Sequence, residues 1–130
     1  MSTGEKVEKK RILVIDDEPN LLEVIRLRLE ANDYEVLTAQ DPLAGLEIAK
    51  EEMPDLIIMD VIMPKVNGLR LLRILKREDE TKDIPVIILS VQWHDNNHKA
   101  GVDAGADYYL TKPYDPKELL DTVKKVLEGR

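Results

Sequence analysis

Four short apolar runs in the sequence each end in residues whose side chains can do chemistry. The residues that follow these runs are Asp16, Asp17 and Glu18 after RILVI, Asp60 after DLIIM, Ser90 after PVIIL, and Thr111 and Lys112 after DYYL. Carboxylates held close together repel one another and raise one another's pKa unless a cation intervenes. Oxygen ligands without His or Cys favour Mg²⁺ or Ca²⁺, and a few carboxylates that leave positions for water and phosphate suit Mg²⁺ better.

The apolar runs alternate with longer segments that have helical spacing and charged faces. This alternation predicts an α/β fold in which a parallel sheet is covered by helices on both faces. Right-handed crossovers and one reversal of winding give a doubly wound, flavodoxin-like, five-stranded sheet of order 2-1-3-4-5 with five helices. We expect the strands at residues 11–15, 34–39, 55–59, 85–89 and 107–110.

Start signals predict where the helices begin. They are Pro19 after an acidic pair, Asp41-Pro42, and Asp115-Pro116 followed by Glu118. Leucines on one side of residues 69–77 predict a third helix. Asparagines and a glycine after Ser90 lower helix propensity, so we expect a short or frayed fourth helix there.

In such a sheet, ligands bind beyond the carboxyl ends of the strands, near the point where the winding reverses. Asp60 then faces the acids that follow the first strand, and Lys112 supplies a positive charge. A single acid after a strand often does no more than cap a turn. A turn, however, does not need a lysine opposite three acids, so the whole set predicts a cation-binding site.

The composition of the chain limits the number of domains, the kinds of partner and the location that we expect. The 130 residues fit one domain, and we expect a flexible tail at residues 1–9 followed by the domain at residues 10–130. The net charge of −7 argues against nucleic acid or an anionic membrane as a direct partner. The sequence has no cysteine, no signal peptide and no run long enough to cross a membrane. We therefore expect a soluble, cytoplasmic protein.

The chain resembles the receiver domain of two-component response regulators, the fold of the chemotaxis response regulator. The resemblance covers residues 11 to about 127 and rests on four segments in order: VIDDEP (Val14–Pro19), MDVIMPKVNG (Met59–Gly68), Ser90 after PVIIL, and GADYYLTKP (Gly105–Pro113).

The resemblance implies a role for each residue of the predicted site. Asp60 would be the phosphoacceptor that takes a phosphoryl group from a phosphohistidine. Mg²⁺ would be bound by Asp16, Asp17, Asp60 and the backbone carbonyl of Ile62. Magnesium and Lys112 would neutralise the charge that builds up on the phosphoryl oxygens.

The resemblance also implies switch and structural residues. Ser90 would be the hydroxyl that turns to the new phosphate, and Tyr109 the aromatic side chain that follows it and alters the face made by the fourth helix, fifth strand and fifth helix. From the sequence, a buried core tyrosine is the alternative for Tyr109. A cis peptide is expected at Lys112-Pro113, and Met63, Pro64 and Gly68 would shape the loop after Asp60 and start the third helix.

The implied function is a phosphorylation-activated switch that modifies only itself and turns over no external substrate. Its partners would be a sensor histidine kinase or phosphotransfer protein and a downstream target, with a phosphorylation-dependent homodimer as a further option. A hydrolase with an aspartyl nucleophile, a flavin binder and a scaffold that never accepts phosphate are the alternatives. The sequence leaves open whether the regulator stands alone or is the receiver of a longer protein.

Two positions depart from the usual pattern of the family and suggest altered kinetics. Val91 stands after the switch hydroxyl where the family commonly has Ala, and apolar Ile62 stands where polar side chains can help position water. We predict that Val91→Ala speeds phosphotransfer from small donors or loss of phosphate to water, because it removes bulk beside the site. Rates of both steps measured with magnesium present test this, and two unchanged rates would exclude a role for Val91.

Overall fold

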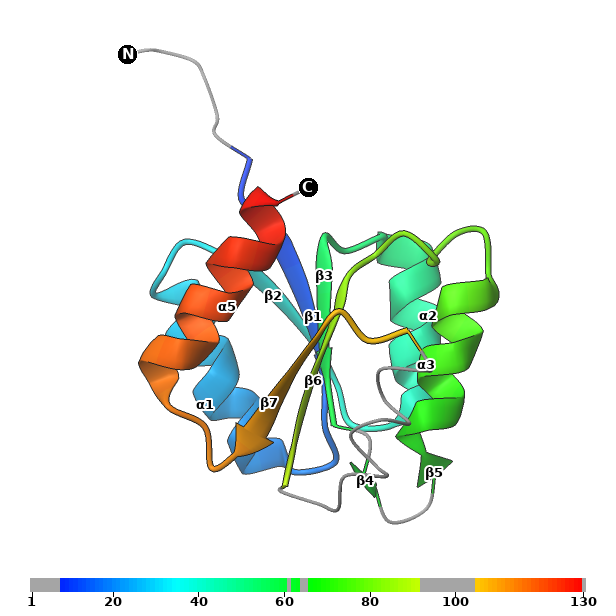
Figure 1. The fold of residues 1–130 in the computed structure, drawn as a ribbon, viewed down its shortest axis with the longest axis horizontal. Helices are drawn as coiled ribbons and strands as arrows, with labels where there is room; N and C mark the ends of the chain where they lie inside the picture. The colour runs from blue at the N-terminus through cyan, green and yellow to red at the C-terminus, as the bar shows by residue number, and fades with distance from the viewer. Residues whose placement is uncertain (1–7, 61, 64–65, 92–104, 130) are drawn as a thin grey trace.

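The computed structural model describes residues 8–60, 62–63, 66–91 and 105–129. Five parallel strands form its central sheet, in the order β2-β1-β3-β6-β7, which confirms the predicted order (Figure 1). These strands are β1 (Arg11–Ile15), β2 (Glu35–Ala39), β3 (Leu56–Met59), β6 (Val86–Val91) and β7 (Tyr108–Lys112).

Helices cover both faces of the sheet, with α1 and α5 on one side and α2 and α3 on the other (Figure 1). Their bounds are α1 (Pro19–Glu30), α2 (Pro42–Glu52), α3 (Gly68–Arg77) and α5 (Pro116–Glu128). Five helices were expected, and the described part of the chain contains four. The segment after Ser90 where the fourth helix was expected, residues 92–104, lies outside the described residues.

Strand ends differ from the prediction at the last two strands. The predicted strands stop at Leu89 and Leu110, where the apolar runs stop, but β6 and β7 each continue two residues further. Ser90 pairs with Thr111 in this extension. The reason is that ladder hydrogen bonds satisfy the backbone whether or not the side chains are apolar. Ser90 and Lys112 are therefore positioned by strands rather than by loops.

A second element was missed by the sequence analysis. Strands β4 (Ile62–Met63) and β5 (Val66–Asn67) pair antiparallel just after Asp60. Two-residue strands carry no periodic pattern of their own, so only the turn between them could have indicated the pair.

The starts of α2 and α5 follow the capping rules that the sequence indicated, whereas α1 begins at the predicted Pro19 without a side-chain cap from Glu18. The Asp41 side chain accepts a hydrogen bond from the Ala44 amide at 2.9 Å, and Asp115 accepts one from the Lys117 amide at 2.9 Å. Proline occupies the first turn of both helices, where its missing N–H costs nothing. These caps fix where α2 and α5 leave the sheet.

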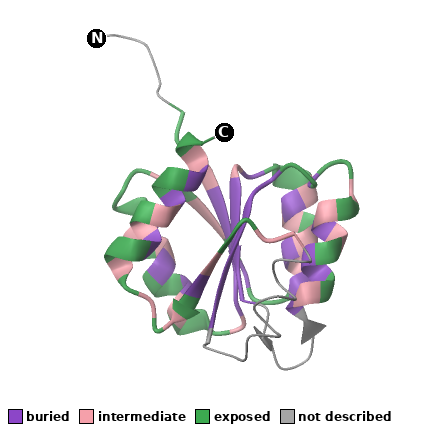
Figure 2. Cartoon of the chain, viewed as in Figure 1, coloured by how far each residue is buried: buried purple, intermediate pink, exposed green. Residues whose placement is uncertain are grey.

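The core consists of two apolar clusters, one on each side of the sheet. Successive strand residues point to opposite faces, so Leu13 and Ile15 pack toward α2 and α3 while Ile12 and Val14 pack toward α1 and α5. All four side chains are at most 1% exposed. Figure 2 shows the central strands buried almost throughout, as expected for a sheet covered on both faces.

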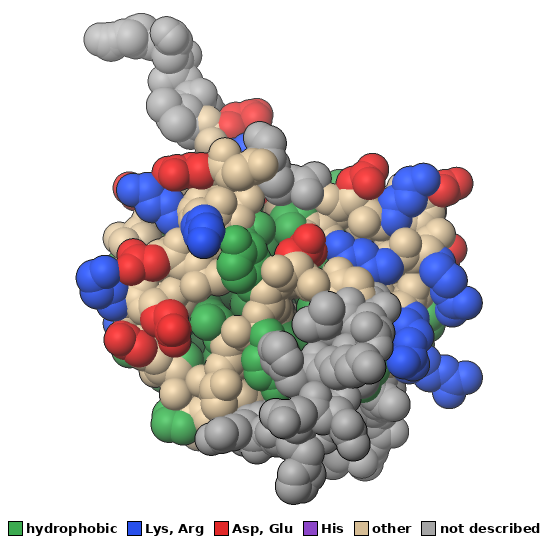
Figure 3. Space-filling view, viewed as in Figure 1, with side chains coloured by type: hydrophobic (Ala, Val, Ile, Leu, Met, Phe, Trp, Pro, Cys, Tyr) green, Lys and Arg blue, Asp and Glu red, His purple; other side chains and the backbone are tan. Residues whose placement is uncertain are grey.

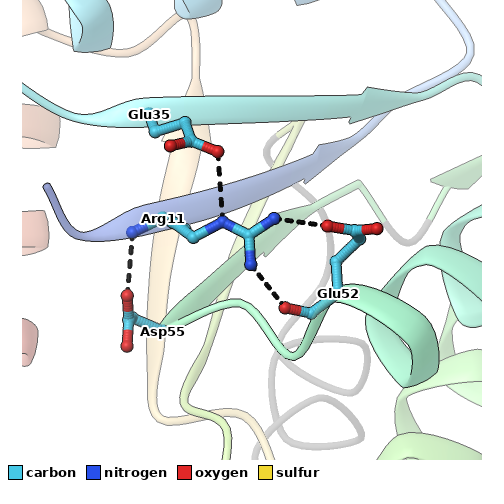
Figure 4. A network of polar contacts seen from close by, with 4 residues as sticks. All are labelled: Arg11, Glu35, Glu52 and Asp55. Carbon is cyan, nitrogen blue, oxygen red and sulfur yellow. Dashed lines mark hydrogen bonds and ion pairs between the residues drawn. The ribbon is translucent and has the colours of Figure 1, made fainter. Parts of the chain in front are cut away.

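Arg11 ties together the amino-terminal edge of the sheet (Figure 4). Its guanidinium donates to Glu35 on β2 at 3.1 Å, and to the carbonyl and carboxylate of Glu52 at the end of α2. Its backbone amide donates to Asp55 at 2.8 Å, just before β3. These contacts join four segments, and the hydrogen bond with Glu52 is the main reason that the pKa of Arg11 is raised.

A second polar anchor holds α3 against the entry into β7. Lys76 donates from Nζ to the Ile84 carbonyl at 2.8 Å and to the Asp107 carboxylate at 3.2 Å. The same Asp107 oxygen accepts the Val86 amide at 2.8 Å. Gly105 allows this arrangement, because its φ is +109° and a Cβ there would lie 2.9 Å from Cγ of Lys76.

We predict that Gly105→Ala lowers the free energy of unfolding by about 1–2 kcal/mol, because an L side chain is strained at this φ. Urea unfolding measures the change. Lys124→Ala, at an exposed position of α5, is the matched control and should have little effect. Equal stabilities of wild type and Gly105→Ala would contradict the strain argument.

Candidate functional site

The carboxyl ends of β1, β3, β6 and β7 meet at one edge of the sheet and carry the predicted chemical residues. Asp16 directly follows β1, and its amide donates to the Ala39 carbonyl at 3.1 Å. Asp60 directly follows β3, and its amide donates to the Ile15 carbonyl at 3.0 Å. The sheet ladder thus extends into the site and fixes the backbone of both acids.

Lys112, at the end of β7, bridges these two acids. Its Nζ lies 2.7 Å from Oδ2 of Asp16 and 3.0 Å from Oδ2 of Asp60. Ser90 donates from Oγ to the other oxygen of Asp60, Oδ1, at 2.6 Å. Both oxygens of the Asp60 carboxylate are therefore held in place, and Asp60 itself is only 5% exposed.

Three carboxylates gather at this edge. One ligand oxygen from each of Asp16, Asp17 and Asp60 lies within 4.8 Å of the others. Burial raises the pKa of Asp16 above its ordinary value, although the hydrogen bond from Lys112 acts in the opposite direction. For Lys112, burial alone would lower the pKa, but the hydrogen bonds to Asp16 and Asp60 outweigh it and the pKa is raised. The ammonium thus stays charged.

The net charge of this cluster is suited to the binding of one divalent cation. With the three carboxylates ionised and one ammonium, the cluster carries a net charge of −2, which one divalent ion would neutralise. All the side-chain donors are hard oxygens, the kind that Mg²⁺ and Ca²⁺ prefer. The residues at this edge therefore fit a divalent metal.

An interaction that the sequence analysis missed orients Asp16. The Glu18 amide donates to Oδ1 of Asp16 at 3.0 Å, while Lys112 holds the other oxygen. An aspartate that accepts an amide two residues later forms an Asx turn, and this local signal could have been used. The Glu18 side chain itself is exposed and lies outside the cluster of carboxylates.

The remaining predicted residues lie around the cluster. Tyr109 is half-buried, packs against the apolar cluster of the α2 and α3 side, and pairs in register with Ile88 of β6. The peptide bond between Lys112 and Pro113 is cis. Gly68 is buried and starts α3. Backbone pairing places Ile62 and Met63 in β4, whereas Pro64 lies outside the described residues.

This sheet order, with acids after the first and third strands and a lysine closing the last, defines a receiver domain. The chain belongs to the response regulator receiver domain family, whose family model matches residues 12–124. Members of this family are the phosphorylation-regulated signalling domains of two-component systems, and they bind a divalent metal at their acidic pocket.

Individual relatives agree with this assignment. The chain is 40% identical to the DNA-binding dual master transcriptional regulator RpaA of Synechocystis sp. over 90% of its own length and 48% of that protein. It thus spans about half of this curated relative. It is 39% identical to the protein PilH of Pseudomonas aeruginosa, over 92% and 98% of the two chains.

A solved structure shows the same fold. The CheY-like response regulator receiver domain protein of Methanospirillum hungatei JF-1 has a TM-score of 0.88 with this chain and 30% sequence identity. The match covers 94% of this chain and 96% of that one. Among the described residues, no helix has the length and apolar character needed to cross a membrane.

We predict that Lys112→Met lowers the free energy of unfolding by about 2–4 kcal/mol in metal-free buffer, because two buried carboxylates lose their cation. Added Mg²⁺ should recover part of the loss. Urea unfolding with and without Mg²⁺ measures both effects. Lys117→Met removes an exposed ion pair with Asp121 and is the matched control, for which little change is expected. A similar, small loss in both variants would contradict the bridging role of Lys112.

Proposed function

We propose that this receiver domain accepts a phosphoryl group on Asp60 from the phosphohistidine of a sensor histidine kinase or phosphotransfer protein. One observation carries the proposal: the Asp60 carboxylate is buried beside Asp16 and Asp17 while Ser90 and Lys112 hold its two oxygens. A carboxylate fixed in this way is oriented toward an incoming phosphorus atom before the donor arrives.

The transfer needs little covalent help from the protein. An oxygen of Asp60 forms the new bond to phosphorus, the bond from phosphorus to the histidine nitrogen breaks, and the electron pair stays on the imidazole. Lys112 lies within hydrogen-bond distance of Asp60, so its ammonium is placed to stabilise negative charge that develops on the phosphoryl oxygens. The domain modifies only itself in this step, and we assign it no external substrate.

Magnesium is the metal that we assign to the site. Asp16, Asp17 and Asp60 would bind it together with the backbone carbonyl of Ile62, because a few carboxylates that leave coordination positions for water and phosphate suit magnesium better than calcium. The bound ion would supply positive charge to the phosphoryl oxygens during transfer. Lys112 alone cannot balance three carboxylates.

Phosphorylation would be signalled to a partner protein through a rearrangement of Ser90 and Tyr109. Residues paired in register on parallel strands point to the same face, and so do residues two apart on one strand. Ser90 is two residues from Ile88, which pairs with Tyr109, so Ser90 and Tyr109 share a face of the sheet. If the Ser90 hydroxyl turns from Asp60 to the new phosphate, space next to Tyr109 changes. The surface formed by β7 and α5, together with the expected fourth helix, would then bind a downstream protein or a second copy through a population shift.

We predict that incubation with Mg²⁺ and a small acyl phosphate adds the mass of one phosphoryl group to the protein, and that Asp60→Asn abolishes the addition. Removing metal with a chelator should also abolish it. Intact-protein mass spectrometry measures the product. Asp33→Asn, which changes a carboxylate in an exposed turn, is the matched control and should be phosphorylated like wild type. A phosphorylated Asp60→Asn protein would place the acceptor elsewhere.

A further inference from the structure

Three arginines line the outer surface of α3. Arg70, Arg73 and Arg77 are three and four residues apart, so they share one stripe of the helix, and all three side chains are exposed. Within the part of the chain that the structure describes, no salt bridge involves Arg70 or Arg73, and Arg77 interacts electrostatically with the adjacent Glu78. Figure 3 shows Lys and Arg side chains along the side of the molecule where α3 lies. This row of positive charge lies on a chain whose net charge is −7.

A complementary acidic stripe lies on the neighbouring helix. Glu47 and Glu51 are four residues apart on the outer surface of α2, and both are exposed. Neither forms an ion pair within residues 8–60, 62–63, 66–91 and 105–129. Helices α2 and α3 pack side by side on the same face of the sheet, joined by the ion pair of Lys50 and Glu78 at 2.7 Å (Figure 1). The outer surfaces of two neighbouring helices thus carry a basic stripe and an acidic stripe.

The two stripes match in spacing and direction. Both helices follow parallel strands, so they run in the same direction back across the sheet. Four residues separate Glu47 from Glu51 and also Arg73 from Arg77, which is a rise of about 6 Å in each helix. A two-fold axis along the seam between α2 and α3 would lay each α2 over the α3 of a second copy, with all helices parallel. Glu47 and Glu51 of each copy would then face Arg73 and Arg77 of the other copy. The two-fold axis forms the same set of pairs twice.

We propose that the outer surface of the α2 and α3 layer is a self-association surface whose occupant is a second copy of this chain. The acidic stripe favours a second copy over a polyanion as the occupant of this surface. Glu47 and Glu51 are exposed on the helix next to α3 and would repel a nucleic acid or an acidic peptide, whereas a second copy uses both stripes. The surface includes no residue of the proposed phosphorylation site, so association does not depend on phosphorylation.

The strength of this association follows from the type of contact. Exposed ion pairs each contribute little and are screened by salt, so we expect a weak dimer with a dissociation constant on the order of 0.1–1 mM. Sedimentation equilibrium of the unphosphorylated protein, up to about 1 mM, should show a mass that rises with protein concentration and falls toward the monomer in about 0.5 M salt.

Charge reversal tests the pairing itself. Arg73→Glu/Arg77→Glu and Glu47→Arg/Glu51→Arg should each be monomeric, because each puts like charges opposite one another. An equimolar mixture of the two variants should form a heterodimer. A chain carrying all four substitutions keeps the composition and net charge of wild type and should dimerise again.

A matched control separates pairing from net charge. Lys9→Glu/Lys10→Glu, at two exposed positions ahead of β1, lowers the net charge from −7 to −11, as does Arg73→Glu/Arg77→Glu, since each reversal changes the charge by two. This control should keep the wild-type association apart from a small general repulsion, and circular dichroism should confirm that every variant is folded. A monomeric wild type at about 1 mM would overturn the proposal. So would a mixture or four-fold variant that fails to restore the dimer, or a monomer that binds a polyglutamate peptide or a DNA duplex through the arginines.

Discussion

Repulsion between buried carboxylates is the constraint on which this structure depends. Three acids offer oxygens within 4.8 Å of one another, and the side chain of one lysine lies between two of them. A compact ammonium on a flexible stem suits this position, because it can donate to two separate carboxylates without the planar geometry that a guanidinium imposes. The remaining negative charge makes the site receptive to a divalent cation.

The two edges of the sheet carry different polar networks. At the amino-terminal edge, Arg11 and Lys76 satisfy the carboxylates and carbonyls around them, and these contacts join strands, helices and loops. At the carboxyl edge, the part of the chain that the structure describes places three carboxylates around the ammonium of Lys112. The polar contacts that join segments of the fold therefore lie at one end of the strands, and the residues that we propose for the chemistry lie at the other.

The sequence predicted most of the fold because its patterns were local and strong. The bounds of β1 match the predicted run at residues 11–15, and the caps at Asp41 and Asp115 form as the turn chemistry requires. The ends of β6 and β7 were wrong, because backbone pairing extends past the last apolar side chain to Ser90 and Lys112. The β4 and β5 pair was missed because two-residue strands have no measurable period.

The chemical residues were identified by type and position, but their geometry was not. Sequence placed Asp16 and Asp17 together, yet only the structure shows that Asp16 is buried at 2% exposure while Asp17 is half-buried. That difference depends on the turn formed with the Glu18 amide and on the reach of Lys112 from a strand 96 residues away. A contact over such a separation cannot be read from local pattern.

The bond between Ser90 and Asp60 explains how a small chemical change could be passed on. A serine hydroxyl has one proton to donate, and Ser90 is fully buried with that proton directed at Oδ1 of Asp60 at 2.6 Å. Donation to the carboxylate and donation to a phosphoryl oxygen are therefore mutually exclusive. Two exclusive bonds define two states, and a phosphoryl group shifts their populations only by the difference in its interactions with them. Ser90 of β6 and Tyr109 of β7 lie on the same face of the sheet, so in the switch that we propose a change of partner at Ser90 would be passed to the neighbouring strand through these side chains.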